Sequence, residues 1–166
     1  PITHLDGSYS GPGSHVENAL VHQPNAVDII RPHKLIDDGL FDVDGIFGGF
    51  DLGAAFGTAV LASEKGKVIL VADQDKYCYK AAYGKVVVIE HENNLTTIYA
   101  HLSRPAVKEN DIINRGDVIG YSGRTGYATG PHLHLTLYAS QTVTIRPSRT
   151  CGLMPYGAPL DPQDYL

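Results

Sequence analysis

The sequence predicts a mainly β single domain built on an antiparallel sheet. Short runs rich in valine, isoleucine and threonine recur along the chain, and residues that favour turns separate them. The chain contains 18 glycines and 10 tyrosines, a composition typical of strands joined by tight turns. No segment carries apolar residues at the spacing of an amphipathic helix. A length of 166 residues is enough for one domain with a buried core and short for two.

The chain divides into two parts by composition. Residues 1–45 are rich in Gly, Pro, His and Asp, and we expect an irregular segment packed on the same domain, with one short strand at residues 26–31. Residues 46–166 are expected to form the β domain itself. This part begins with two apolar runs, Thr58–Ala62 and Lys67–Ala72, which are separated by Ser-Glu-Lys-Gly and predict a hairpin.

A second hairpin and two further strands complete the predicted sheet. Lys85–His91 and Leu95–His101 flank the tripeptide Glu-Asn-Asn, in which asparagine tolerates the left-handed conformation that a tight turn requires. Asp117–Ser122 and Leu133–Tyr138 follow at roughly regular spacing. His91, at the end of its strand, is expected to be a solvated turn residue.

Charge and hydropathy argue against a nucleic-acid ligand and against a transmembrane segment. The net charge of −5 argues against nucleic acid as the main ligand, because phosphate binding needs a basic surface. No run of ~18 apolar residues could serve as a transmembrane segment, and the first residues lack the basic and apolar stretches of a signal peptide.

Cys78 and Cys151 leave two alternatives open, one disulfide in an oxidising compartment or two buried thiols.

The sharpest chemical signal is the sequence Gly-Pro-His-Leu-His at residues 130–134. Residues two apart in a strand point to the same face, so His132 and His134 are expected to lie side by side. A third histidine, His101, ends another predicted strand, and Asp51 precedes one. Three histidines and an aspartate at strand ends are the ingredients of a catalytic zinc site, which needs three protein ligands and an open fourth position.

Several segments, taken in order, resemble the lysostaphin/LytM-type zinc endopeptidases. The resemblance covers about two thirds of the chain. The matching segments are residues 50–53, 57–60, 66–68, 83–91, 97–103, 115–120, 122–126, 129–134 and the closing residues 160–166. It implies a lysostaphin/LytM-like β fold, and it implies that residues 46–166 form a catalytic domain.

The resemblance also implies a function and a site. Asp51 and His134 would bind one zinc ion, while His101 and His132 would act as catalytic histidines. The implied function is a zinc-dependent endopeptidase that cleaves peptide cross-links of bacterial peptidoglycan. Its location would be extracytoplasmic (periplasmic, secreted or virion-associated), and a phage-tail or secretion-apparatus protein is a further expected partner.

One position departs from the family pattern. The family places a histidine ligand four residues before the aspartate, where this chain has Phe47. In the leading interpretation, His33 supplies the third nitrogen, with His22 and His15 as more distant alternatives. In a second, the chain is a catalytically inactive module that uses the same groove to bind wall peptide or a partner protein. A third uses a different ligand set, for example with Asp44 as an oxygen donor.

Overall fold

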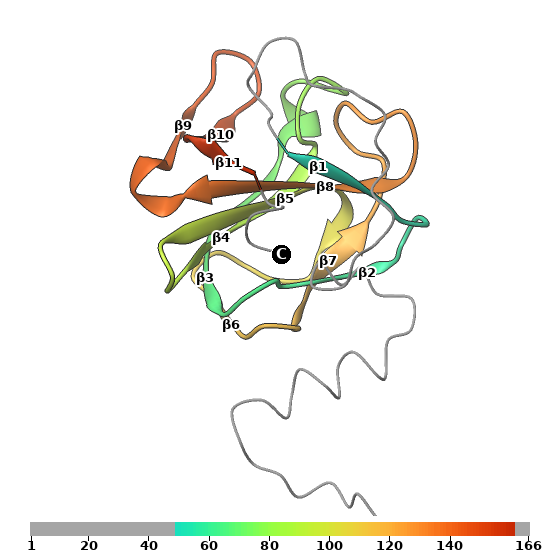
Figure 1. Ribbon diagram of the computed structural model, residues 1–166. Helices are drawn as coiled ribbons and strands as arrows, with labels where there is room; N and C mark the ends of the chain where they lie inside the picture. The colour runs from blue at the N-terminus through green and yellow to red at the C-terminus, as the bar shows by residue number, and fades with distance from the viewer. Residues whose placement is uncertain (1–48, 162–166) are drawn as a thin grey trace, which may run out of the picture.

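The computed structural model describes residues 49–161. These residues form an almost entirely β domain, in which the helices are two single 3₁₀ turns (Figure 1). The predicted fold class is confirmed. The elements are β1 (Phe50–Gly53), β2 (Ala59–Leu61), β3 (Gly66–Asp73), η1 (Gln74–Lys76), β4 (Lys85–His91), β5 (Leu95–Pro105), β6 (Ile112–Ile113), β7 (Val118–Ser122), β8 (His132–Ala139), η2 (Ser140–Thr142), β9 (Thr144–Pro147), β10 (Leu153–Tyr156) and β11 (Pro159–Leu160).

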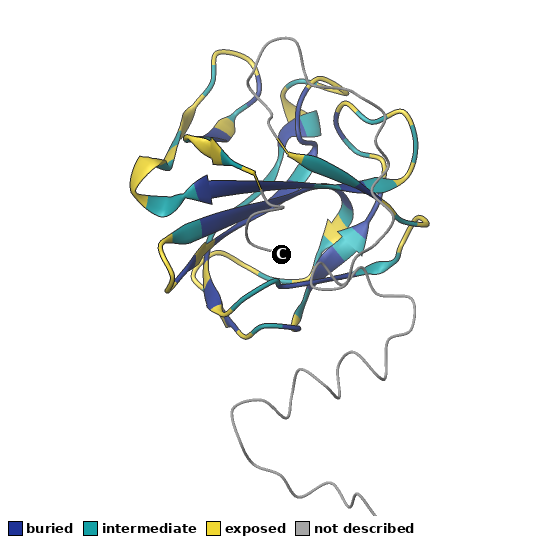
Figure 2. Cartoon of the chain, viewed as in Figure 1, coloured by how far each residue is buried: buried dark blue, intermediate teal, exposed yellow. Residues whose placement is uncertain are grey.

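One large antiparallel sheet organises the domain. Its main path runs β1-β8-β5-β4-β3-β6, while β7 pairs with both β5 and β2, and β11 pairs with β8. The separate β9–β10 hairpin lies near the end of β8 (Figure 1). Figure 2 shows that buried residues concentrate along the central strands and that exposed residues gather in the loops. No helix among residues 49–161 has the length and apolar character needed to cross a membrane.

Apolar residues pack on both faces of the sheet. On one face, Leu133 and Leu135 of β8 join a cluster with residues such as Val87 and Tyr99. On the other face, Val88 and its neighbours pack beneath residues of the β9–β10 hairpin. Side chains alternate between the two faces of a strand, and both faces of the central strands are covered. A central strand therefore buries its odd-numbered and its even-numbered side chains. This explains why the central strands are continuous apolar runs.

The second predicted hairpin is confirmed. β4 and β5 pair as antiparallel neighbours across a short turn. Asn94 adopts the left-handed conformation there, with φ 61°. Asparagine reaches this conformation more easily than most residues, so the turn chemistry and the observed turn agree.

The first predicted hairpin is wrong. β2 pairs with β7, while β3 pairs with β4 and β6. The backbone of Ala62, just after β2, also turns to the segment before β7: its N–H donates to the carbonyl of Asp117, and its carbonyl accepts from Gly116. Sequence neighbours often pair, but here a long-range partner takes the edge of β2. The short strand expected at residues 26–31 lies outside the described residues.

A disulfide joins Cys78 to Cys151, which settles the alternative left open by the sequence. The two residues are separated by 73 positions, and their Cα atoms lie 4.8 Å apart. Cys78 follows η1, and Cys151 precedes β10. The bond therefore links the segment between β3 and β4 to the β9–β10 hairpin, two parts that share no strand pairing.

His91 is a buried residue, and the prediction of a solvated turn residue is wrong. It is 5% exposed. Its Nδ1–H donates to the carbonyl of Lys65 at 3.0 Å, and its Nε2 accepts from the hydroxyl of Thr97 at 2.7 Å. Burial opposes the charged form and lowers the pKa of His91 from its ordinary 6.5, although the Lys65 carbonyl and Glu64 act in the opposite direction.

This buried histidine should make stability depend on pH. The unfolded chain binds a proton at His91 more readily than the folded chain, so the free energy of unfolding should fall as pH drops below about 6.5 towards the lower folded pKa. His91→Gln should remove that part of the slope, and the variant should lose less stability than the native chain between pH 7.5 and pH 5. Urea unfolding at several pH values measures this. Parallel curves for the two proteins would contradict it.

Candidate metal centre

Strand β8 presents one polar row of side chains. His132, His134 and Thr136 alternate with the buried Leu133 and Leu135, as the two-residue period of a strand requires. The predicted side-by-side arrangement of the two histidines is therefore present. The apolar row anchors the strand in the core, which holds the polar row on the opposite face.

Asp51 reaches this row from the neighbouring strand. Asp51 and His134 are directly opposed partners in the β1–β8 ladder. Opposed residues of an antiparallel pair hold their Cβ atoms within ~5 Å of each other. The Oδ1 of Asp51 lies 2.8 Å from the Nδ1 of His134 and 3.6 Å from the Nε2 of His132. The carboxylate lies within β1, rather than just before a strand as predicted.

His101 enters the same site through an irregularity in β5. Up to Ala100 the strand pairs with β8, and from Leu102 onwards it pairs with β7. At the change of partner His101 has φ 58°, a left-handed conformation that is uncommon for a residue with a side chain. Irregularities of this kind re-aim side chains. The ring of His101 lies 4.7 Å from that of His132 and 5.7 Å from that of His134, between centroids.

Backbone carbonyls hold two of the three imidazoles in one tautomer. The Nδ1 of His101 lies 2.7 Å from the carbonyl of Thr125, and that of His132 lies 2.9 Å from the carbonyl of Gly130. A carbonyl only accepts hydrogen bonds, so each Nδ1 carries the proton. The Nε2 atoms of His101 and His132 take no part in these hydrogen bonds, and that of His132 lies 3.6 Å from the Oδ1 of Asp51.

His134 has a different arrangement of partners. Its Nδ1 faces Asp51, and its Nε2 lies 3.1 Å from the hydroxyl of Thr136. A second hydrogen bond of this kind fixes the ring of a metal-binding histidine. The backbone at Gly49 also passes close to the His134 ring. A Cβ atom on Gly49 would lie 2.9 Å from the Nε2 of His134 and 2.6 Å from the Thr136 hydroxyl. Only glycine fits at this position.

Electrostatics favour an ionised Asp51 and a neutral His101. Burial raises the pKa of Asp51, but the hydrogen bond from His134 and the nearby histidine charges outweigh it, and the pKa lies below its ordinary 3.8. For His101, burial and then repulsion from His132 and His134 lower the pKa from 6.5 to about 4. His101 is thus neutral at pH 7, with an imidazole nitrogen available to take a proton.

The described residues include the kinds of side chain that bind zinc, but too few of them to complete a site. A carboxylate oxygen and imidazole nitrogens are ligands that zinc binds. Within residues 49–161, however, no group of three or more His, Cys, Asp or Glu side chains is placed to hold a metal ion. All the candidates for a third zinc ligand lie outside the described residues: His33, His22, His15 and Asp44. Phe47, which stands where the family has a histidine ligand, also lies outside them.

Comparison with known protein families assigns the chain to one of them. The sequence model of peptidase family M23 matches residues 46–147, more than half of the chain. The chain belongs to peptidase family M23. This confirms the resemblance to the lysostaphin/LytM-type enzymes, and the matched segment contains every described residue of the candidate site.

Relatives of this M23 chain include two bacterial endopeptidases. It is 52% identical over 54 residues to the peptidoglycan DD-endopeptidase ShyA of Vibrio cholerae, a match that covers 32% of this chain and 13% of ShyA. It is 49% identical over 55 residues to the DD-carboxypeptidase/endopeptidase Mpg of Neisseria meningitidis, covering 33% of this chain and 13% of Mpg. The chain therefore matches about an eighth of the length of these relatives.

Solved structures extend the likeness over more of this M23 chain. The catalytic domain of lysostaphin from Staphylococcus simulans superposes with a TM-score of 0.56 at 26% identity, covering 81% of this chain and 85% of that domain. A mutant catalytic domain of the prophage-encoded M23 protein EnpA from Enterococcus faecalis gives a TM-score of 0.55 at 28% identity, covering 70% and 76%.

Sequence reasoning missed three residues that support the histidines. Thr136 lies two positions after His134, so the same two-residue period that paired the histidines could have found it. The carbonyl of Thr125 left no signal, because any residue supplies a carbonyl. Asp75, whose carboxylate accepts the N–H of Gly126, lies in η1, 51 residues earlier in the sequence.

Proposed function

We propose that this chain is a zinc-dependent endopeptidase that cleaves peptide cross-links of bacterial peptidoglycan. The observation that carries the proposal is the pairing of Asp51 with His134, with His101 and His132 beside them. A carboxylate and an imidazole at one spot are a zinc donor pair. The likeness to ShyA, a peptidoglycan DD-endopeptidase, supports the substrate class. Because peptidoglycan lies outside the cytoplasmic membrane, the chain would act there.

His33 is our candidate for the third ligand. Its imidazole would replace the one that Phe47 cannot provide, and residues 35–49 would form a loop between the two ligand segments. His22 and His15 could reach the site only through a longer loop, and Asp44 would offer oxygen in place of nitrogen. The expectation of a phage-tail or secretion-apparatus partner stays a prediction.

The described residues suggest how the reaction would proceed. A zinc ion held by Asp51, His134 and the third ligand would lower the pKa of a water molecule towards ~7 and polarise the scissile carbonyl. The Nε2 of His132, freed by the hydrogen bond from Nδ1–H to Gly130, would take a proton from the attacking water and pass it to the leaving amine. The neutral His101 would orient the attacking water by accepting a hydrogen bond at its Nε2, so that the proton follows the one route through His132.

A second candidate function is a catalytically inactive M23 module that binds wall peptide or a partner protein. Phe47 favours it, because phenylalanine cannot bind a metal and leaves two of the family's three ligand positions. The four site residues argue for the enzyme, since a binding groove without turnover has no chemical need for them.

Metal content separates the two candidates. The untagged protein should bind one equivalent of zinc, measured by elemental analysis. Asp51→Ala, His134→Ala and His33→Ala should each weaken zinc binding by about 10²–10³-fold, if each ligand contributes a quarter of the binding free energy of a four-ligand site. His22→Ala and His15→Ala are the matched controls for His33.

The outcomes assign the function clearly. A folded native chain that binds no zinc and gains zinc in Phe47→His would identify the inactive module. Zinc binding that survives His33→Ala but is lost in His22→Ala or His15→Ala would move the third ligand to that histidine. Release of soluble fragments from purified sacculi, abolished by a chelator and restored by zinc, would complete the case for the enzyme.

A further inference from the structure

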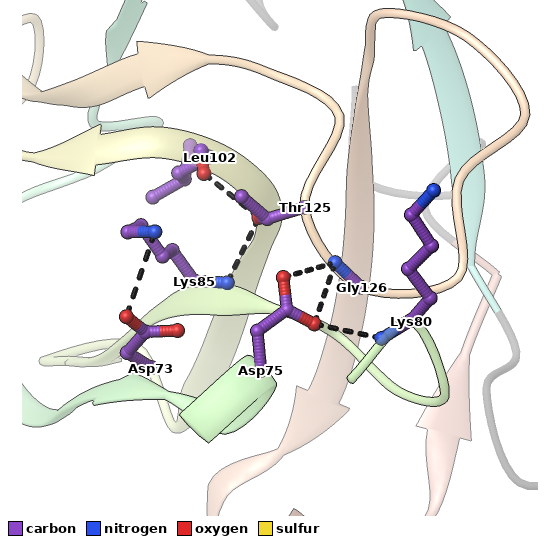
Figure 3. A network of polar contacts seen from close by, with 7 residues as sticks. All are labelled: Asp73, Asp75, Lys80, Lys85, Leu102, Thr125 and Gly126. Carbon is purple, nitrogen blue, oxygen red and sulfur yellow. Dashed lines mark hydrogen bonds and ion pairs between the residues drawn. The ribbon is translucent and has the colours of Figure 1, made fainter. Parts of the chain in front are cut away.

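The peptide group between Thr125 and Gly126 links His101 to the carboxylate of Asp75 in η1. Its carbonyl accepts the hydrogen bond from the Nδ1–H of His101 at 2.7 Å. Its N–H donates to both carboxylate oxygens of Asp75, at 3.2 and 3.1 Å (Figure 3). The two ends of one amide are therefore occupied, one by the imidazole and the other by a negative charge.

We propose that Asp75 is a positioning residue for His101 and acts through this peptide group. Metal-site and catalytic histidines commonly donate their second N–H to a carboxylate or a carbonyl, which fixes the tautomer and the ring orientation. Here the carbonyl is itself part of an amide whose N–H is bound by a carboxylate. Hydrogen bonds in a chain polarise one another, so the charge on Asp75 makes the Thr125 carbonyl a stronger acceptor.

The position of the peptide group is closely determined. The hydroxyl of Thr125 donates to the carbonyl of Leu102 at 2.8 Å and accepts from the N–H of Lys85 at 2.9 Å (Figure 3). Gly126 has φ 67°, a conformation suited to glycine. A Cβ atom on Gly84 would collide with the Gly126 nitrogen and the Thr125 carbonyl carbon. These contacts bring the peptide close to β4 and β5 and limit how far its carbonyl can turn while the fold is intact.

Asp75 is in turn anchored by the segment that follows η1. Its Oδ1 accepts the backbone N–H of Lys80 at 3.0 Å, and Lys80 adopts a left-handed conformation with φ 55° (Figure 3). The residue after Gly126, Tyr127, donates its N–H to the carbonyl of Ala82. The loop after η1 and the loop before β8 are thus held together on either side of the carboxylate.

The proposal rests on the catalytic role proposed for His101, so its main test does not use activity. Long-range ¹H–¹⁵N correlation spectra of the metal-free protein at neutral pH report which nitrogen of His101 carries the proton. The native chain should show the Nδ1–H tautomer with a slowly exchanging proton. Asp75→Ala should shift both ¹⁵N resonances towards a mixture of tautomers, and Asp75→Asn should shift them less, because an amide oxygen can still accept from Gly126.

A matched control separates positioning from loss of a loop contact. Asp111 is also partly exposed and caps a turn by accepting the backbone N–H of Lys108 at 2.8 Å. Asp111→Asn should leave the His101 resonances unchanged. If Asp75→Asn and a folded Asp75→Ala both show His101 resonances within the spread of this control, the proposal is overturned. Should Asp75→Ala fail to fold, the comparison of Asp75→Asn with Asp111→Asn decides.

Hydrolysis of a soluble cross-linked muropeptide gives a second readout. Asp75→Ala should lower kcat by about 10–100-fold, the cost typical of losing a partner that orients a site histidine, and should change KM much less. An Asp75→Ala variant with native kcat would contradict the proposal. A native chain without hydrolase activity would refute the proposed function, while the spectra would still test the link between Asp75 and His101.

Discussion

His132→Ala is expected to lower kcat on a cross-linked muropeptide by about 10²–10⁴-fold, the range for loss of a positioned general base. The imidazole of His132 is fixed by Gly130, and its Nε2 lies 3.6 Å from Asp51, beside the donor pair proposed for zinc. We do not propose it as a ligand, so the variant should still bind one equivalent of zinc. Stopped assays on the muropeptide and elemental analysis measure the two effects.

His91→Gln is the matched control for this experiment. It likewise replaces a histidine, one that is buried, but His91 contacts Lys65 and Thr97, away from the site. Near neutral pH it should keep the native kcat. If His132→Ala lost zinc along with activity, His132 would be a ligand and the proposed third donor would be unnecessary. If His132→Ala kept the native kcat, its catalytic role would be refuted.

Removal of the Cys78–Cys151 disulfide is expected to lower the free energy of unfolding by about 4 kcal/mol. The estimate follows from the loop-closure entropy that a cross-link across 73 residues removes from the unfolded chain. Cys151 is also buried in the apolar cluster beneath the β9–β10 hairpin, so replacing both residues with alanine changes the packing there as well. Urea unfolding of Cys78→Ala/Cys151→Ala against the native chain measures the loss.

The reductant-treated native chain provides the control for side-chain volume. It keeps both cysteines and loses only the bond, so it should unfold at a urea concentration close to that of the double variant. Reductant should have no effect on the double variant itself. Equal unfolding midpoints for the oxidised and reduced native chains would show that the bond contributes little.

Local patterns predicted those parts of the structure that depend on neighbouring residues. The β4–β5 hairpin followed from two apolar runs around an asparagine-containing turn, and the shared face of His132 and His134 followed from the two-residue period of a strand. The hairpin expected between β2 and β3 was wrong because β2 finds its partner, β7, far along the chain. His91 was misjudged for the same reason, since its position in the sequence says nothing about what covers it.

Sequence by itself determined the β class, the M23 resemblance and the identities of Asp51, His101, His132 and His134 as the residues of interest. Tertiary structure alone decided that Asp51 of β1 lies opposite His134 of β8 and that an irregularity in β5 turns His101 towards them. It also decided that Cys78 bonds to Cys151. It also joined Asp75 to His101 through one peptide group. The physical reason is the same in each case: strand period and turn preference act between near neighbours, whereas ladder register and loop contacts depend on the whole packed chain.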